Sequence, residues 1–392
     1  MDKPLSIKTG HVFDELSAWQ DNFAGIASQP LTYCPALPQI TKRYEAFWNQ
    51  AILDRPIFIA YTDKNPSRLI TTGIENLQVP QTWFEQKMLS LEQTVCIGDA
   101  VPQVQLDLGS MPLAGLWGGE RVVGAGTVWT HPFINDEWSN APDWLGIHES
   151  PLWATFKELL AKLADHASGR YMITSPDWGA TADLLAITRG SESLCLDLLD
   201  KPEQVLTAVA SIYPAWADAY QEFYNWASHH GVGVLEWLKV WSQEPYVICA
   251  CDFSALIGPA HFQRFFLPDI ASRAATVGRA MYHLDGPNAI RHVDAILEIP
   301  EIKAVQYSPP PGDSCLQWME LYHKIQDSGR SVYIICEPDE VLALAAALKP
   351  EGLALILREA DYSFGQAEKA LYKPLDPTET QQLFEEFCRK YI

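Results

Sequence analysis

The second half of the chain alternates short apolar runs with amphipathic stretches. Each run is five or six residues long and rich in β-branched, aromatic and other apolar side chains, which is typical of strands covered on both faces. From the second run onward the starts are separated by 23, 29 and 22 residues. This spacing predicts repeated strand–helix units in a parallel sheet. The five runs are Tyr246–Cys251, Arg279–His283, Ile302–Tyr307, Ser331–Cys336 and Leu353–Leu357.

The first half is less regular and offers three further strands, at Arg55–Tyr61, Pro102–Leu108 and Tyr171–Thr174. Helical periodicity surrounds them, over Leu152–His166 and Pro202–Ala227. Three early and five late strands add up to eight, the number that a closed (β/α)8 barrel requires. We therefore predict an α/β fold of this kind, a TIM barrel. An open doubly wound sheet is the alternative, but the Gly-rich turn that usually marks it is missing from the sequence.

Two stretches do not fit the alternation. Gly118–Thr130 alternates with period two around glycines, which predicts a β-hairpin inserted in a loop. Gly233–Trp241 could be an additional strand. Because no linker or long internal repeat interrupts the chain, we expect one domain, with residues 1–50 as a helical N-terminal cover and residues 51–392 as the barrel.

Composition excludes several classes of protein. The 392 residues are 48% apolar and 20% charged, which rules out disorder, and the net charge is −21. Nucleic acid and anionic membranes are bound through Lys and Arg, so neither is an expected partner. No apolar run approaches the ~20 residues of a membrane span. Eight cysteines are scattered without a CxxC pair, which favours a reducing, cytoplasmic location with free thiols.

Polar side chains follow most of the predicted strands. In a barrel, catalytic groups lie at the carboxyl ends of the strands, so these residues are the candidates for a site. Several of the candidates are aromatic, and the chain holds 14 Trp. Such side chains could line a binding pocket or only pack loops. The candidates are Tyr61, Asp107, Asp177, Trp178, Trp237, Asp252, His283, Asp285, Tyr307, Glu337 and Arg358.

His283 and Asp285 form the sharpest local pattern. Residues i and i+2 of a strand point to the same side, so both side chains could face one cavity. There they could hold a metal or act as an acid–base pair. The structural alternative is a histidine that only hydrogen-bonds to a neighbour. Gly286 and Pro287 end the strand directly afterwards, which favours a position at its end.

The other ionisable candidates each have two interpretations. Asp252 is either a site residue or the N-cap of the following turn. Glu337 precedes a proline, so it is either a tentative third metal ligand or a helix-start residue. Arg358 could bind a substrate carboxylate bidentately or pair with a nearby acid. Asp107 would face the barrel mouth if the alternation of its strand holds.

Three segments resemble the uroporphyrinogen decarboxylase superfamily. They are Thr174–Gln204, Cys251–Ile270 (CDFSALIGPAHFQRFFLPDI) and His283–Ile290 (HLDGPNAI). The resemblance extends from about Arg43 to the C-terminus and implies a TIM-type barrel and a homodimer. It also implies one of two activities, cofactor-free decarboxylation of tetrapyrrole side chains or zinc-dependent methyl transfer from a corrinoid to a thiol.

The sequence departs from both branches. An Arg-rich motif of the decarboxylases is replaced by IAYTDKNPSR, and the His-x-Cys zinc motif of the methyltransferases by His283-Leu-Asp285. We expect a metal-assisted methyltransferase acting on a small molecule, with zinc as the candidate metal at His283, Asp285 and Glu337, and a corrinoid protein or thiol acceptor as partner. The alternatives are a decarboxylase that uses Asp107 or Asp285 with Arg358, and a barrel that binds a small molecule without catalysis.

Overall fold

The computed structural model describes residues 13, 15–65, 76–124, 127–135, 137–358 and 374–391. They form a mixed α/β fold, as the strand–helix spacing predicts. The strands are β1 (Ile57–Asp63), β2 (Thr94–Gly98), β3 (Gln103–Gln105), β4 (Arg121–Gly124), β5 (Thr127–Thr130), β6 (Met172–Thr174), β7 (Val234–Leu235), β8 (Val247–Ala250), β9 (Ala280–Asp285), β10 (Ile302–Ser308), β11 (Ser331–Cys336) and β12 (Leu353–Leu357).

A seven-stranded sheet organises most of the chain, in the order β2-β1-β12-β11-β10-β9-β8. The five late strands, β8 to β12, are parallel and each pairs with the next in sequence, which confirms the prediction from their spacing. β1 joins β12 in parallel. β2 lies antiparallel on the free edge of β1 and was not predicted, because its residues are only half-buried and lack an apolar run.

β3, β6 and β7 form a separate three-stranded parallel sheet. The predicted insert is present as an antiparallel pair, β4 with β5. Among the described residues, backbone hydrogen bonds thus join nine parallel strands and β2 into two sheets. In a closed barrel the free edge of β1 would pair with β3, but β2 occupies it. Closure of all strands into one barrel therefore remains a prediction.

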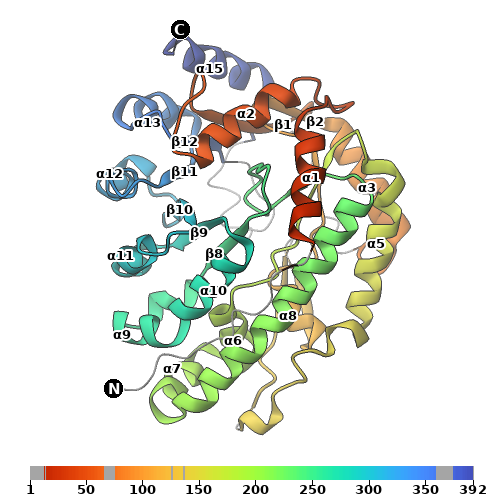
Figure 1. Cartoon of the computed structure of the whole chain (residues 1–392), viewed down its shortest axis with the longest axis vertical. Helices are drawn as coiled ribbons and strands as arrows, with labels where there is room; N and C mark the ends of the chain where they lie inside the picture. The colour runs from red at the N-terminus through yellow and green to blue at the C-terminus, as the bar shows by residue number, and fades with distance from the viewer. Residues whose placement is uncertain are drawn as a thin grey trace.

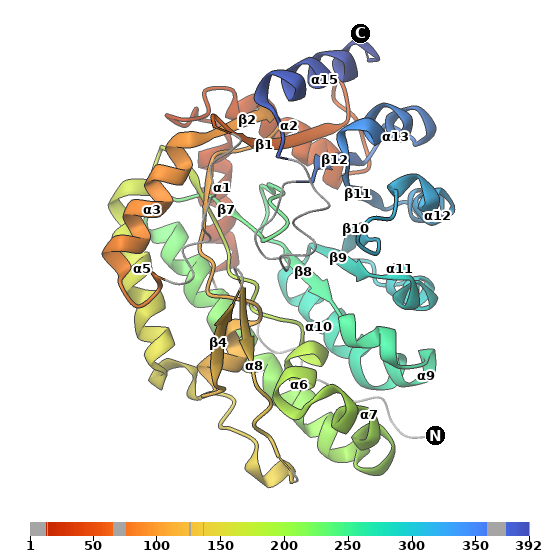
Figure 2. The same cartoon turned by 180° about the vertical axis from the view of Figure 1, so that it is seen from behind.

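Helices cover the outer side of the seven-stranded sheet, and a second layer holds the long helices α5 and α8 (Figure 1). Seen from behind, strands β8 to β12 and the helices that follow them lie on one side of the molecule, and α3 and α5 lie on the other (Figure 2). The main helices are α1 (Leu16–Ala27), α2 (Leu37–Trp48), α3 (Pro80–Gln93), α4 (Pro112–Leu116), α5 (Pro151–Ala167), α6 (Thr181–Arg189), α7 (Ser191–Asp200), α8 (Pro202–His229), α9 (Pro259–His261), α10 (Leu267–Val277), α11 (Val293–Leu297), α12 (Met319–Asp327), α13 (Val341–Ala347) and α15 (Pro377–Arg389).

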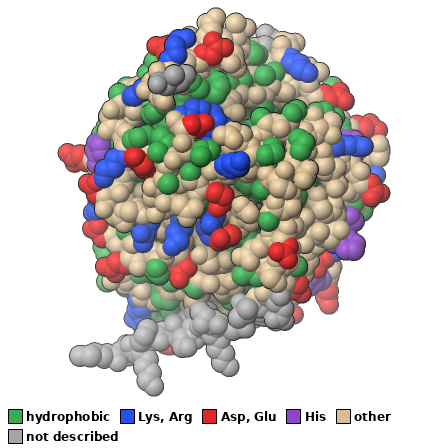
Figure 3. All heavy atoms as spheres, turned by 45° about the horizontal axis from the view of Figure 1, so that its top comes forward, with side chains coloured by type: hydrophobic (Ala, Val, Ile, Leu, Met, Phe, Trp, Pro, Cys, Tyr) green, Lys and Arg blue, Asp and Glu red, His purple; other side chains and the backbone are tan. Residues whose placement is uncertain are grey.

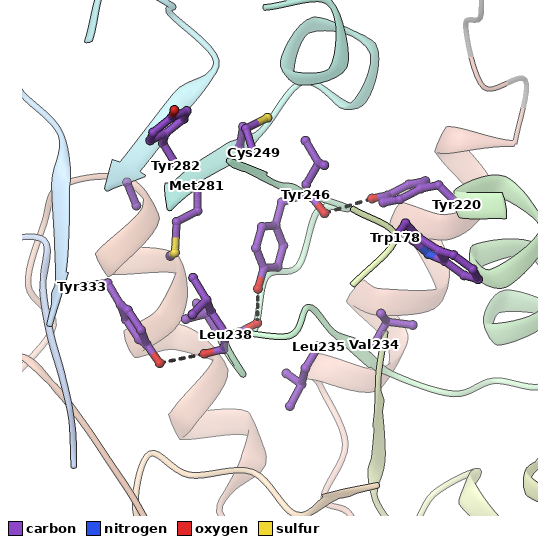
Figure 4. Packing of buried hydrophobic residues seen from close by; sticks show 14 of the residues in the cluster. Trp178, Tyr220, Val234, Leu235, Leu238, Tyr246, Cys249, Met281, Tyr282 and Tyr333 are labelled. Carbon is purple, nitrogen blue, oxygen red and sulfur yellow. Dashed lines mark hydrogen bonds between the residues drawn. The ribbon is translucent and has the colours of Figure 1, made fainter. Parts of the chain in front are cut away.

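The connection between β7 and β8 runs through the core. We call Glu236–Ser242 the central segment. Tyr333 of β11 donates a hydrogen bond to Leu238 O at 2.7 Å, and Tyr246 donates to Val240 O at 2.8 Å (Figure 4). The Nζ atom of Lys239 lies 5.1 Å from the ring centre of Tyr61 on β1. The central segment therefore contacts strands on distant parts of the large sheet, and ties the core together.

One face of the molecule is mixed in charge despite the acidic total. On the face in Figure 3, Lys and Arg side chains are interspersed with Asp and Glu. In the part of the chain that the structure describes, no helix combines the length and apolar character needed to cross a membrane. All eight cysteines are unpaired.

Candidate functional site

His283 is the centre of the candidate site. It lies on β9 opposite Gln306 of β10, and its Nδ1 is hydrogen-bonded to Gln306 Oε1. An amide oxygen only accepts, so this bond places a ring proton on Nδ1, and in the neutral imidazole Nε2 then carries the lone pair. Nε2 lies 3.9 Å from Asp252 Oδ1, and the indole of Trp237 stacks edge-on against the imidazole at 5.2 Å.

Asp252 follows β8 after one residue, Cys251, and opens a short 3₁₀ helix, η4 (Asp252–Leu256). Asp183 of α6 accepts the backbone N–H groups of Asp252 at 3.1 Å and of Phe253 at 2.7 Å, which fixes the start of this turn. The Asp252 side chain is 42% exposed, yet its Oδ1 is buried and has no hydrogen-bond partner. Burial raises the pKa of Asp252, His283 lowers it, and Asp285 raises it further.

The histidine is thus paired with an acid of the neighbouring strand. Asp285, the predicted partner, is exposed at the end of β9. It is on the same face as His283, as the i, i+2 spacing requires, and its charge acts on Asp252. The structure therefore brings His283, Asp252 and Asp285 into one region, but the close contact is between His283 and Asp252.

Asp177 and Trp237 line a narrow recess beside this pair. Asp177 Oδ1 accepts the backbone N–H of Gly179 at 3.1 Å. Burial raises the pKa of Asp177 to about 6; the Gly179 N–H opposes this, Asp252 adds to it, and His283 and Arg273 lower it. The charges of Asp252 and His283 therefore act on a side chain inside the recess. Trp178 also lines it, but is buried and packs edge-on against Phe156.

Glu236 was missed by the sequence interpretation. It is 4% exposed, lies directly after β7, and lines the same recess. Tyr224 of α8 donates a hydrogen bond to its Oε1 at 2.7 Å. The available signal was an acid directly after the apolar pair Val234–Leu235. The sequence analysis considered one continuous strand over Gly233–Trp241. In such a strand Glu236 would lie in the middle and not at the end, so it was not taken as a candidate.

Asp107 and Tyr61 have partners elsewhere. Asp107 Oδ1 accepts the N–H of Gly109 at 2.8 Å, and its charge acts on Arg121 of β4, so the described contacts place it beside the inserted hairpin. Tyr61 is buried, and its hydroxyl donates to Val101 O at 3.0 Å. These contacts are structural, and no described contact joins either residue to His283.

Tyr307 was predicted to bind substrate, and the register places it on the other face of the sheet from His283. It pairs with Leu284 of β9, whereas Gln306 pairs with His283. Successive strand residues face opposite sides, so Tyr307 points away from His283 and packs against Trp318 at 4.9 Å. Gln306, one residue earlier, is on the same face as His283.

Arg358 and Glu337 bind each other. Arg358 Nε lies 2.9 Å from Glu337 Oε1, and this ion pair is the salt-bridge alternative considered for Arg358. Glu337 also caps a short helix, in which Glu340 Oε2 accepts its backbone N–H at 2.9 Å. The helix-start interpretation of Glu337 is therefore confirmed, while the metal and substrate roles of the two side chains stay predictions.

Comparison with known proteins adds no assignment to this geometry. A scan against protein-family models found no match, and neither did a search of curated proteins. The interpretation of the site therefore relies on its residues alone.

Proposed function

We propose that this chain is an enzyme whose reactive pair is His283 and Asp252, and that it catalyses metal-assisted methyl transfer to or from a small molecule. The observation that carries the proposal is the unsatisfied Asp252 Oδ1, which lies 3.9 Å from the imidazole nitrogen Nε2 of His283. A buried carboxylate oxygen without a partner is costly unless something binds it.

A divalent metal suits the chemistry of these two donors. Zinc bonds of about 2.0–2.2 Å at a tetrahedral angle would bring nitrogen and oxygen to about 3.3–3.6 Å, so the two side chains would approach by a few tenths of an ångström on binding. The hydrogen bond between Gln306 and Nδ1 orients the imidazole in the way that supporting residues orient metal-bound histidines. When bound, the metal would lower the pKa of an acceptor such as a thiol. The described residues contain no group of three or more side chains suited to a metal.

This chain's residues supply the rest. Trp237 shields one side of the imidazole, and Asp183 holds the turn that carries Asp252. The resemblance to the uroporphyrinogen decarboxylase superfamily supports the same location, because its methyltransferases have their first ligands at the fifth strand. A closed barrel and a homodimer are part of the same proposal, with a corrinoid protein or a thiol as the candidate partner.

Zinc binding tests the proposal. We expect calorimetry with Zn²⁺ alone to detect one site in the purified protein, and the variants His283→Ala and Asp252→Asn to weaken it at least tenfold. Asp285→Asn distinguishes the close pair from the i, i+2 pair, and should weaken binding much less. The surface variant Asp294→Asn is the matched control. Wild-type protein that binds zinc no better than His283→Ala would contradict the metal-assisted reaction.

Decarboxylation of a carboxylate substrate is the second candidate. The raised pKa values of Asp177, to about 6, and of Asp252 favour it, because a protonated acid near neutral pH can supply the proton that replaces CO₂. Turnover that survives chelators and is lost in Asp177→Asn would select this reaction over methyl transfer. Ligand binding without turnover, unchanged in His283→Ala, would instead indicate a binding protein.

A further inference from the structure

Glu236 is a buried carboxyl group without a cation in its described contacts. The side chain is 4% exposed, and its printed partners are the hydroxyl groups of Tyr224 and Ser175. Burying an ionised carboxylate is costly unless a cation or several donors compensate. Arg273, which lines the same recess, is paired with Asp269 at 3.2 Å and stacks on Trp216.

Counting donors and acceptors indicates which protonation state fits. Ser175 has one hydroxyl proton, and it donates that proton to Pro176 O at 2.9 Å. While this bond is formed, Ser175 has no proton left to donate to Glu236. Tyr224 donates to the carboxyl group at Oε1. With this one donor and no cation among its described contacts, the buried carboxyl group is better satisfied when neutral than when ionised.

The recess connects this acid to the reactive pair. Glu236 and Asp177 both line it, and the charge of Asp177 raises the pKa of Glu236. His283 and Asp252 in turn act on Asp177. Both proposed reactions require the transfer of one proton. In methyl transfer the acceptor loses a proton, and in decarboxylation the carbon that loses CO₂ gains one.

We propose that Glu236 is a protonated acid at neutral pH, and that it exchanges its proton with Asp177 across the recess. In this exchange the Glu236 O–H bond breaks as an O–H bond forms on the Asp177 carboxylate, and the reverse step restores both groups. The exchange serves the reaction at His283 and Asp252, so this part rests on the proposed function. The protonation state of Glu236 does not rest on the proposed function.

Burial is consistent with this assignment. It raises the pKa of Glu236 to about 8; the Tyr224 and Ser175 contacts lower it and the Asp177 charge raises it. The titratable and charged groups that face the glutamate from the surrounding elements are Asp177, Tyr220, Tyr224, Tyr246 and Arg273, with Lys239 in its own turn.

Infrared difference spectroscopy of the full chain tests the assignment. At about pH 7 we expect a C=O stretch of a buried protonated carboxyl group that is lost in Glu236→Gln. The exposed control Glu203→Gln, at a residue 85% exposed, should retain it. Because an amide is also neutral and nearly isosteric, the variant should keep the Tyr224 and Ser175 contacts and fold. Absence of the band in the wild type, or its persistence in Glu236→Gln, would overturn the proposal.

Two further variants test the shared recess and protect the test against a folding failure. Asp177→Asn removes a neighbouring negative charge, so the midpoint at which the band bleaches should move to lower pH. Tyr224→Phe removes a donor that favours the ionised form, so the midpoint should move to higher pH. An unchanged midpoint in Asp177→Asn would overturn the exchange between the two carboxyl groups. Failure of the proposed function would appear separately, as absent zinc binding and absent turnover in a protein that retains the band.

Discussion

At the residue scale, Glu236 makes stability depend on pH. The unfolded chain releases this proton near pH 4.5 and the folded chain near pH 8. The stabilisation from a neutral Glu236 is therefore complete below about pH 4.5 and is lost as the pH rises to about 8.

Glu236→Gln does not titrate and should escape this loss. Relative to wild type, its free energy of unfolding should improve by on the order of 4 kcal/mol between about pH 5 and pH 8. Urea denaturation at both pH values measures the difference. Parallel pH profiles for the two proteins would contradict a neutral buried Glu236.

Gly98 is a second residue with a local constraint. Its φ is +71°, and a Cβ atom would lie 2.3 Å from Phe58 O. We expect Gly98→Ala to destabilise the protein by about 3 kcal/mol, since backbone atoms must move in addition to the left-handed strain. Gly278→Ala is the matched control, because its φ is +88° and no atom lies within 4 Å, so only about 1 kcal/mol is expected. Equal losses in thermal or urea unfolding would show that the close approach is unimportant.

The residue scale also explains where sequence interpretation of the site succeeded. His283 could be recognised because a histidine at the end of an apolar strand is an unusual local pattern. Asp252 was a candidate too, but its close contact with His283 could not be recognised. Asp252 is 31 positions earlier in the numbering and meets His283 only through the pairing of β8 with β9. Tyr307 was chosen over Gln306 because strand spacing does not reveal which face is inward.

At the element scale, the turn that carries Asp252 depends on a side chain from another helix. Asp183 accepts two backbone N–H groups at the start of η4. Asp183→Ala would leave both buried donors unsatisfied, so we expect a loss of about 2–4 kcal/mol in stability.

The same variant should weaken zinc binding, because Asp252 would no longer be held near His283. Asp294→Ala, which removes a surface ion pair with Lys324, should cost under about 1 kcal/mol and leave zinc binding unchanged. Chemical denaturation and calorimetry measure both effects. Full zinc affinity in Asp183→Ala would contradict its role in positioning Asp252.

The helical segment that follows η4 is another case at this scale. The structure has α9, then a π-helical turn η5 (Phe262–Phe266), then α10. Pro268 has no N–H to donate to Arg264, so the regular hydrogen-bond pattern cannot continue there. Hydrophobic periodicity does not reveal this irregularity, since the apolar spacing is similar in both forms.

At the scale of the whole molecule, the N-terminal cover is part of the core. Trp19 of α1 is fully buried, donates to Asn225 of α8 at 2.8 Å and packs against Tyr224. Trp48 of α2 donates to Trp241 O of the central segment at 2.8 Å. Both predicted cover helices thus contact the elements that hold the recess.

Removal of residues 1–50 should therefore abolish folding instead of trimming an accessory part. It would expose the aromatic side chains of α8 and the central segment, and each large core side chain is worth roughly 3–5 kcal/mol. We expect the truncated chain to lack the near-ultraviolet circular dichroism of the full chain, because its buried aromatic rings would lose their fixed packing. A truncated protein that keeps this signal and unfolds cooperatively would contradict a single folding unit.

The sequence by itself determined the five late parallel strands, their helices, the inserted hairpin and the position of His283. These follow from local periodicity and from residues next to one another in the chain. The tertiary structure decided that β2 takes the edge of β1, that the central segment passes through the core, and that His283 meets Asp252 beside Asp177 and Glu236. These depend on strand register and on contacts between distant segments, which hydrophobic pattern alone does not encode.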